Sequence, residues 1–286
     1  MPETLRMETL NDARVLDALL GDQFAARLEA LAQAKKEEYQ ANTPYPHIYF
    51  DDFLPREVAE AALQTFPEPK EADWHAYRDV NQRKKLSFDS VEKLPPPIRD
   101  VLWFLNSRPM LRFLETLTGI QAVLPDPYYA GGGLHQIMPG GLLEVHADFS
   151  YHKALRLDRR INVLIYLNKD WKEEYGGHFE LWDRKVTHAE KKILPVFNRC
   201  AIFSTTSWSF HGHPTPLACP PDRTRKSIAT YYYTNGRPEE EVGEAHSTLF
   251  KARPGEVEQP QRSTFQSFMR AVTPPILVDA YKSLRK

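Results

Sequence analysis

Two short segments of the chain place histidine and carboxylate side chains at spacings that suit a metal ion. The segment EVHADFSYH covers residues 144–152, and its apolar, alternating pattern predicts a β-strand in its first half. Successive side chains of a strand alternate between faces, so His146 and Asp148 point the same way and can bind one ion. His152 follows a Phe-Ser-Tyr stretch that is expected to leave the strand, so we interpret it as an ordinary loop histidine.

A third ligand is available in STTSWSFHGHP, where His211 and His213 are again two residues apart on a predicted strand. Two histidines and one carboxylate on one face of a metal leave coordination positions for substrates, as in non-haem Fe(II) oxygenases. Zinc accepts similar ligands, so the triad alone does not identify the metal. The pattern leaves both histidines open as the distal ligand, and a hydrogen bond in the core or in a turn explains each of them taken singly.

An arginine begins the aromatic, β-branched strand predicted over RKSIATYYYT, residues 225–234. A buried guanidinium must be paired, and its planar fork suits bidentate recognition of a carboxylate. Metal ligands together with Arg225 predict a pocket for a dianion such as 2-oxoglutarate, which chelates the metal at one end and meets Arg225 at the other. Arg223 and Lys226 are the nearest alternatives, and Lys226 should face away from Arg225 on the strand.

The elements expected to position these residues change in character along the chain. Residues 9–39, 55–66 and 96–119 carry helical patterns, and residues 44–55 contain a short aromatic strand. From about residue 121 the chain shows short strands separated by Gly, Pro, Asn and charged turns. A run of strands without helices between them pairs antiparallel in a jelly-roll sandwich or barrel. The eight candidates are GGLHQIMP, GLLEVHADF, RINVLIYLN, HFELWD, KKILPVF, RCAIFST, WSFHGH and RKSIATYYYT.

The predicted organisation is therefore a mainly β core with flanking helices. A mostly helical N-terminal region, residues 1–120, should pack on a β core over residues 121–236. A helical C-terminal tail is expected over residues 237–286, because STFQSFMRAV and PPILVDAYKSLRK carry helical patterns.

Composition narrows the class of protein. The 286 residues carry a net charge of −1, so the chain lacks the basic footprint of a nucleic-acid-binding protein. Arg83 to Lys85 form a short basic cluster, which is expected to be a solvated surface. Cys200 and Cys219 show no CxxC spacing and fit a reducing compartment. We see no signal peptide and no apolar stretch of about 18 residues, which favours a soluble cytoplasmic protein.

Several motifs together resemble the Fe(II)/2-oxoglutarate oxygenases, most closely the prolyl 4-hydroxylase-like branch with its hypoxia-type enzymes. HAD, INVLIYLNKDW, GGHFELW, NRCAIFSTTSWSFHGH and RKSIATYYYT occur in the order and spacing of that family, over about residues 130–236. The resemblance implies a double-stranded β-helix (jelly roll, cupin-like), which agrees with the eight strands found independently.

The resemblance also implies roles for individual residues. His146 and Asp148 match the His-x-Asp ligands of Fe(II), and His211 matches the distal histidine. Arg225 matches the basic residue that binds the far carboxylate of 2-oxoglutarate, and Tyr166 matches a tyrosine that assists it in the hypoxia-type enzymes.

Three further residues are candidates for the rim of the pocket. His213 is left as a hydrogen-bond donor once His211 is the ligand, and Trp208 lies nearby in the sequence. Met138 stands where the hypoxia-type branch has a tyrosine, so the cosubstrate pocket should differ there. The loop between His211 and Arg225 is also longer than in that branch.

The activity that the resemblance implies is hydroxylation of an unactivated C–H bond, with consumption of O2 and 2-oxoglutarate and release of succinate and CO2. The primary substrate would be a prolyl residue or a small amino-acid or biosynthetic molecule. Asp148 argues against a halogenase, which needs a small residue there, and we expect no catalytic residue beyond the metal ligands. Two alternatives use the same fold: a metal-dependent cupin-type enzyme, which has no need of Arg225, and a non-catalytic sensor or binding protein, which need not keep the triad.

Overall fold

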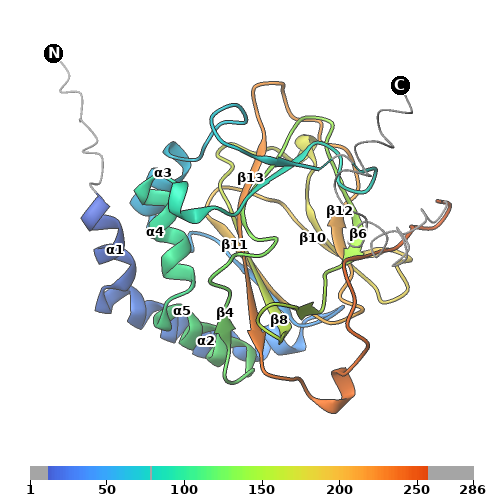
Figure 1. The fold of residues 1–286 in the computed structure, drawn as a ribbon, viewed down its shortest axis with the longest axis horizontal. Coiled ribbons are helices and arrows are strands. Elements are labelled where there is room, and N and C mark those ends of the chain that lie inside the picture. The colour runs from blue at the N-terminus through green and yellow to red at the C-terminus, as the bar shows by residue number, and fades with distance from the viewer. Residues whose placement is uncertain (1–11, 78, 257–286) are drawn as a thin grey trace, which may run out of the picture. The chain divides into compact units, whose positions relative to one another are not determined.

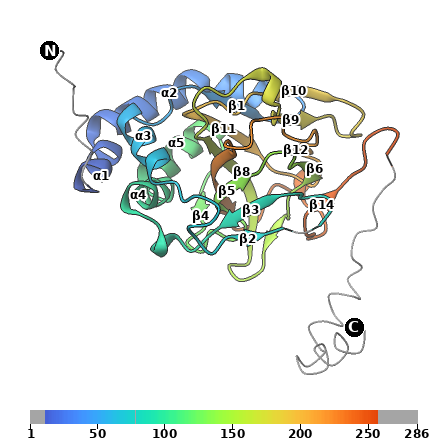
Figure 2. The same ribbon diagram turned by 90° about the horizontal axis from the view of Figure 1, so that it is seen from above.

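The computed structural model describes residues 12–77 and 79–256, in which two antiparallel sheets are flanked on one side by helices (Figures 1 and 2). Residues 252–286 form a separate unit, of which residues 252–256 are described.

The larger sheet has the strand order β1-β11-β8-β13-β5-β3-β2, with β4 paired to β13 and β7 paired to β8. Every pair is antiparallel, as expected for strands joined without crossover helices. Its strands are β1 (His47–Phe50), β2 (His75–Ala76), β3 (Lys85–Phe88), β4 (Leu124–Pro125), β5 (Gly133–Ile137), β7 (Tyr151–His152), β8 (Leu157–Tyr166), β11 (Arg199–Ser204) and β13 (Arg225–Thr234).

The smaller sheet has the order β10-β9-β12-β6-β14. Its strands are β6 (Leu143–Ala147), β9 (Phe179–Trp182), β10 (Ala189–Ile193), β12 (His211–His213) and β14 (Leu249–Phe250). Two antiparallel sheets built from short, non-sequential strands are the double-stranded β-helix expected from the sequence, and that prediction is confirmed.

The helices cover one face of the larger sheet. Pro96 and Pro109 stand in the first turns of α4 and α5, where a missing backbone N–H costs nothing. Gly119 ends α5 in the left-handed conformation at φ 78°, which a glycine adopts without a steric penalty. The helices are α1 (Asp12–Leu20), α2 (Asp22–Ala41), α3 (Arg56–Gln64), α4 (Pro96–Leu105) and α5 (Arg108–Thr118), with short 3-10 turns η1 (Val91–Lys93), η2 (Glu173–Tyr175) and η3 (Glu239–Glu241).

Alternation along β8 shows how the larger sheet separates core from cavity. Ile161 and Val163 are fully buried in the large core that the sheet shares with the helices. Leu164 and Tyr166 point to the opposite face, toward the smaller sheet. Functional side chains on that second face therefore lie between the two sheets.

The N-terminal region contributes strands as well as helices. β1, in the aromatic segment predicted as a strand, pairs with β11, and β3 pairs with β5. β3 was not predicted, because its first residue belongs to the basic cluster. The expectation of a solvated cluster is wrong for Lys85, which is 8% exposed where it begins β3.

The described part of the C-terminal region contains a short strand. Residues 249 and 250 form β14, which pairs with β6 and precedes the two segments whose patterns predicted helices. The helices predicted over 263–272 and 274–286 lie outside the described residues. Within the part of the chain that the structure describes, no helix is long and apolar enough to cross a membrane.

Candidate metal centre

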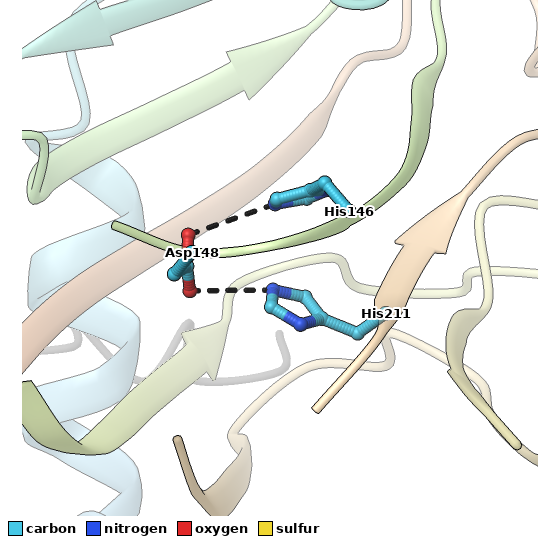
Figure 3. A group of neighbouring side chains, drawn as sticks. All are labelled: His146, Asp148 and His211. Carbon is cyan, nitrogen blue, oxygen red and sulfur yellow. Dashed lines mark ion pairs between the residues drawn. The ribbon is translucent and has the colours of Figure 1, made fainter. Parts of the chain in front are cut away.

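Two adjacent strands of the smaller sheet bring the three predicted ligands together. His146 on β6 is paired directly with His211 on β12, and Asp148 follows β6 by one residue (Figure 3). Nε2 of His146 lies 3.6 Å from Oδ1 of Asp148, and Nε2 of His211 lies 3.4 Å from Oδ2. One donor atom from each residue lies within 4.8 Å of the other two, so a single ion can reach all three.

Backbone carbonyls orient both imidazoles. Nδ1 of His146 lies 2.8 Å from the carbonyl oxygen of Glu144, and Nδ1 of His211 lies 2.9 Å from that of Ser209. When Nδ1 donates to a carbonyl, Nε2 carries the lone pair and is free to bind a metal. Burial, and then the neighbouring His211, lower the pKa of His146, which keeps that ring neutral as a metal ligand must be.

The carboxylate of Asp148 is held by two donors from β8. Oδ2 accepts hydrogen bonds from Arg159 at 2.9 Å and from Asn162 at 2.7 Å. Burial alone would raise the pKa of Asp148, but Arg159 and then His211 hold it well below its usual range. Asp148 is therefore an anion, the form that binds cations.

Arg225 lies in the same cavity, at the start of β13, and is 6% exposed. Its Nε donates to the carbonyl oxygen of Gly177 at 2.7 Å, and Nη2 lies 3.5 Å from the hydroxyl of Tyr166. Among the described residues no carboxylate lies within 4.0 Å of this guanidinium. The cavity is lined by Lys85, His135, Ile137, Leu143, His146, Asp148, Asn162, Leu164, Phe179, His211, Gly212, His213, Arg225, Ser227 and Tyr231.

The two alternatives to Arg225 are directed elsewhere. Arg223 donates to the carbonyl oxygen of Lys169 at 2.9 Å, on the surface. Lys226 points to the other face of β13, where its ammonium lies 2.8 Å from the hydroxyl of Thr224. Neither residue lines the cavity.

His213 lines the cavity two residues beyond His211. It is 3% exposed, and neither of its ring nitrogens has a hydrogen-bond partner among the described residues. Burial, and then Arg225 and Lys85, lower the pKa of His213 well below its ordinary value, so the ring is neutral. A buried imidazole without a partner is costly, which indicates a ligand group beside it.

The remaining candidates lie away from the cavity. Trp208 packs against Tyr45, with ring centres 6.4 Å apart, and neither Trp208 nor Met138 is among the residues that line the cavity. His152 is outside the metal cluster but is not a loop histidine. It is 7% exposed in β7, with Nε2 3.5 Å from Oδ2 of Asp126.

Several residues of the site were not found from the sequence, and four of them carry a charged, imidazole or amide group. Lys85 and His135 line the cavity from β3 and β5, and Arg159 and Asn162 bind Asp148 from β8. Asn162 is the third residue of the predicted strand RINVLIYLN, residues 160–168, and Arg159 immediately precedes that strand. A charged or amide side chain there, in an otherwise apolar strand, was the available signal.

The donor set suits a divalent first-row metal with open coordination positions. Two imidazoles and one carboxylate from two strands are the ligands of non-haem Fe(II) sites, and zinc accepts them as well. Arg225 is buried in the same cavity and has no carboxylate within 4.0 Å in the part of the chain that the structure describes, so it suits an anionic ligand.

Comparison with known proteins finds a family match and a similar fold. Residues 132–233 match the model of the 2OG-Fe(II) oxygenase superfamily, a region that contains His146, Asp148, His211 and Arg225. A prolyl hydroxylase from Trichoplax adhaerens, in complex with a peptide fragment of the hypoxia-inducible factor oxygen degradation domain, is similar at a TM-score of 0.56 and 16% identity, over 76% of this chain and 95% of that one. A Pseudomonas putida prolyl-4-hydroxylase is similar at a TM-score of 0.50 and 15% identity, over 71% of this chain and 98% of that one.

Proposed function

We propose that this chain, whose residues 132–233 match the model of the 2OG-Fe(II) oxygenase superfamily, hydroxylates an unactivated C–H bond of a prolyl residue or of a small amino-acid or biosynthetic substrate. The superfamily uses Fe(II) as cofactor and 2-oxoglutarate as cosubstrate. One observation carries the proposal: a cluster of two histidines and an aspartate shares its cavity with a buried arginine that has no carboxylate within 4.0 Å among the described residues.

His146, Asp148 and His211 are the proposed ligands of Fe(II). The two histidines present Nε2 because backbone carbonyls bind their Nδ1 atoms, and Asp148 is kept ionised by Arg159. Bound there, Fe(II) supplies the redox chemistry that couples decarboxylation of 2-oxoglutarate to oxidation of the substrate. A set of three protein ligands leaves coordination positions for other ligands.

Arg225 is the proposed partner of the far carboxylate of 2-oxoglutarate. Gly177 holds its Nε, so the opposite side of the guanidinium remains available for a bidentate contact. The hydroxyl of Tyr166 lies beside Nη2, and the pKa of Tyr166 is raised by burial, which keeps it a neutral donor. His213 offers a further ring nitrogen to the same ligand.

Apolar and aromatic side chains form part of the cavity wall. Leu164, Phe179 and Tyr231 line it between the two sheets. Apolar surroundings strengthen the electrostatic contacts of the ligands.

The primary substrate is the finer part of the proposal. The peptide in the Trichoplax structure supports a prolyl residue as one possibility. Hydroxylation of a free amino acid or a biosynthetic intermediate needs the same metal site.

We also infer a cytoplasmic location. Cys200 and Cys219 are both free, and burial raises the pKa of each thiol, so neither is poised to react. Free thiols are the usual state in a reducing compartment.

The test is a succinate-release assay with Fe(II), 2-oxoglutarate and O2, run across peptide and small-molecule libraries. Mass spectrometry should find a gain of one oxygen in the substrate that stimulates succinate release. His146→Ala, which removes one proposed ligand, should abolish both signals. If the parent protein releases no succinate and shows no Fe(II)-dependent binding of 2-oxoglutarate, the proposed function is wrong.

A further inference from the structure

The cavity contains a second buried cation, Lys85, which has no role in the reaction proposed above. Lys85 is 8% exposed and lines the cavity together with the metal-binding cluster. Its ammonium donates to Oε1 of Gln82 at 3.1 Å and lies 4.6 Å from the ring centre of Tyr77. Within residues 12–77 and 79–256, no carboxylate lies within 4.0 Å of it.

The charges that line the cavity are unequal. Asp148 is the one carboxylate among the lining residues, and Arg159 already pairs with it. In the proposed reaction, the metal and Arg225 account for the two carboxylates of 2-oxoglutarate. Lys85 is then left as a buried positive charge without an anion, an arrangement that proteins avoid unless a ligand completes it.

Lys85 and Arg225 serve different parts of the cavity. Both are paired with Ile137, one from each side, so their Cα atoms are two strand spacings, about 10 Å, apart on the same face of the sheet. Arg225 turns toward Tyr166 on β8. Lys85 turns the other way, toward Tyr77 in the segment before β3. The two cationic groups diverge, so a single carboxylate bound by one is not shared with the other.

The contacts that Lys85 makes within the protein do not replace an anion. A glutamine amide and a tyrosine ring give a lysine only a small part of the hydration that burial removes. Burial lowers the pKa of Lys85 to about 8, against the opposing effect of Asp148 and Asp79. His135, its neighbour in the cavity, is kept neutral because burial, and then Lys85, lower its pKa to about 3. It therefore adds no charge to the cavity.

We propose that Lys85 binds a carboxylate of the primary substrate, which makes that substrate a small molecule with a free carboxylate, such as a free amino acid, rather than a prolyl residue inside a peptide. This inference rests on the proposed function and narrows it. A carboxylate near Lys85 has one other source, the carboxylate of 2-oxoglutarate that lies next to its oxo group. The experiment must separate these two sources.

The first arm compares ligands on the anaerobic protein loaded with Fe(II) and 2-oxoglutarate. The probes are L-proline and the other common L-amino acids, each with its carboxamide, and a proline-containing peptide blocked at both ends. Binding is followed by calorimetry and by the shift of the visible charge-transfer band. At least one free acid should bind more tightly than its carboxamide, and the same acid should stimulate succinate release and gain oxygen. If no acid binds more tightly than its carboxamide, or the blocked peptide is the better substrate, the inference is wrong.

The second arm of the experiment removes the positive charge of Lys85. Lys85→Met should raise the dissociation constant and KM of the acid about 10- to 100-fold, as expected for loss of a charged hydrogen-bond partner. Its affinity for 2-oxoglutarate should stay within about twofold of the parent, because Arg225 is untouched. Lys85→Arg should keep much of the binding. Lys84→Met is the matched control, since Lys84 is exposed and donates to the carbonyl oxygen of Pro139.

The outcomes separate the inference from the proposed function. If Lys85→Met loses affinity for 2-oxoglutarate and not for the acid, the lysine belongs to the cosubstrate site and the inference is overturned. A parent protein without the charge-transfer band would instead contradict the proposed function. Thermal unfolding of each variant confirms that the folded protein is compared throughout.

Discussion

Arg159 donates a hydrogen bond of 2.9 Å to Oδ2 of Asp148, and this contact determines which carboxylate oxygen is available to a metal. The amide of Asn162 binds the same oxygen at 2.7 Å, while Nε of Arg159 binds the amide oxygen of Asn162 at 2.9 Å. Oδ1 lies 3.6 Å from Nε2 of His146. Arg159, Asn162 and Asp148 are thus hydrogen-bonded to one another through Oδ2 of Asp148, which leaves Oδ1 for the metal.

Removing this support should weaken iron binding without removing a ligand. Arg159→Met should lower the affinity for Fe(II) about 10- to 100-fold, because outer hydrogen-bond partners contribute that much to metal sites. Anaerobic titration of Fe(II) in the presence of 2-oxoglutarate measures it. Arg160→Met is the control, since the guanidinium of Arg160 lies 3.2 Å from Glu241, away from the cluster. Equal affinities in the two variants would contradict this role for Arg159.

Variants of the two histidines of β12 test which of them is the third metal ligand. His211→Ala should lose iron and turnover, because its Nε2 is one of the three converging donors. His213→Ala should retain iron and lose at most part of the activity. Metal content after anaerobic loading distinguishes the two residues. The reverse pattern would move the distal ligand to His213.

The other two ligands have an optical test. His146→Ala and Asp148→Ala should each abolish the weak visible band of the Fe(II)–2-oxoglutarate complex, since each removes one of three protein donors. An unchanged band in both variants would rule out this pair as ligands.

The role of Arg225 is tested by cosubstrate affinity. Arg225→Gln should still fold and bind Fe(II), but should lose about 2–5 kcal/mol of binding free energy for 2-oxoglutarate, as for one partner of a buried charged pair. Arg225→Lys should restore only part of it, since an ammonium lacks the planar fork. Arg223→Gln, which alters a surface contact, should bind like the parent. Calorimetric titration of 2-oxoglutarate into each variant measures this loss. If only Arg223→Gln loses affinity, Arg223 and not Arg225 binds the far carboxylate.

The local sequence pattern was sufficient to predict a strand where the residues of that strand alone show the pattern. RKSIATYYYT matches β13 from its first residue to its last, because a β-branched and aromatic run is bounded by charged and Asn-Gly turns. The last three residues of the predicted strand WSFHGH form β12, and of the predicted pair His146 lies in β6 and Asp148 directly follows it. The metal cluster was predictable because its spacing lies within two short segments.

Long-range pairing was not predictable in the same way. Lys85 belongs to a polar, basic stretch, and it is buried only because β3 pairs with β5, some fifty residues later in the chain. The sequence predicts a loop at His152, because a Phe-Ser-Tyr stretch is expected to leave the strand, whereas pairing of β7 with β8 places His152 beside Asp126. In both cases tertiary contacts outweigh the local pattern.

Asn198 attaches the N-terminal region to the β core, and its loss should destabilise the fold. Its side chain accepts from the backbone N–H of Leu54 at 3.0 Å and donates to the carbonyl oxygen of Leu54 at 2.8 Å, fully buried. Its φ of 59° also favours asparagine over alanine. Asn198→Ala should lower the free energy of unfolding by about 2–4 kcal/mol, since two buried backbone groups lose their partners.

Chemical denaturation measures this loss, and a second variant separates its causes. Asn198→Gly accepts the positive φ without strain but restores neither hydrogen bond. It should therefore remain clearly less stable than the parent. A glycine variant as stable as the parent would assign the whole effect to backbone conformation.

The last prediction concerns pH and the charge of Lys85. Its pKa is lowered from 10.5 to about 8, chiefly by burial, with Asp148 and Asp79 opposing and Arg159 and Arg225 adding to the shift. His135 also faces it but is neutral over this range. Below pH 8 the ammonium is charged and can bind a carboxylate, and above it the neutral amine cannot. The KM of an acidic substrate should therefore rise above about pH 8, while that of Lys85→Arg, which stays charged, should not.

Stability should change in the opposite sense over the same range. The unfolded chain binds a proton at Lys85 up to about pH 10.5, whereas the folded chain releases it near pH 8. Because the unfolded state then holds more protons, this group makes the free energy of unfolding increase between about pH 8 and 10.5. Comparing the pH dependence of unfolding in the parent and in Lys85→Met isolates the contribution. If the two curves run parallel across that interval, Lys85 does not carry the lowered pKa, and the predicted change in KM has no basis.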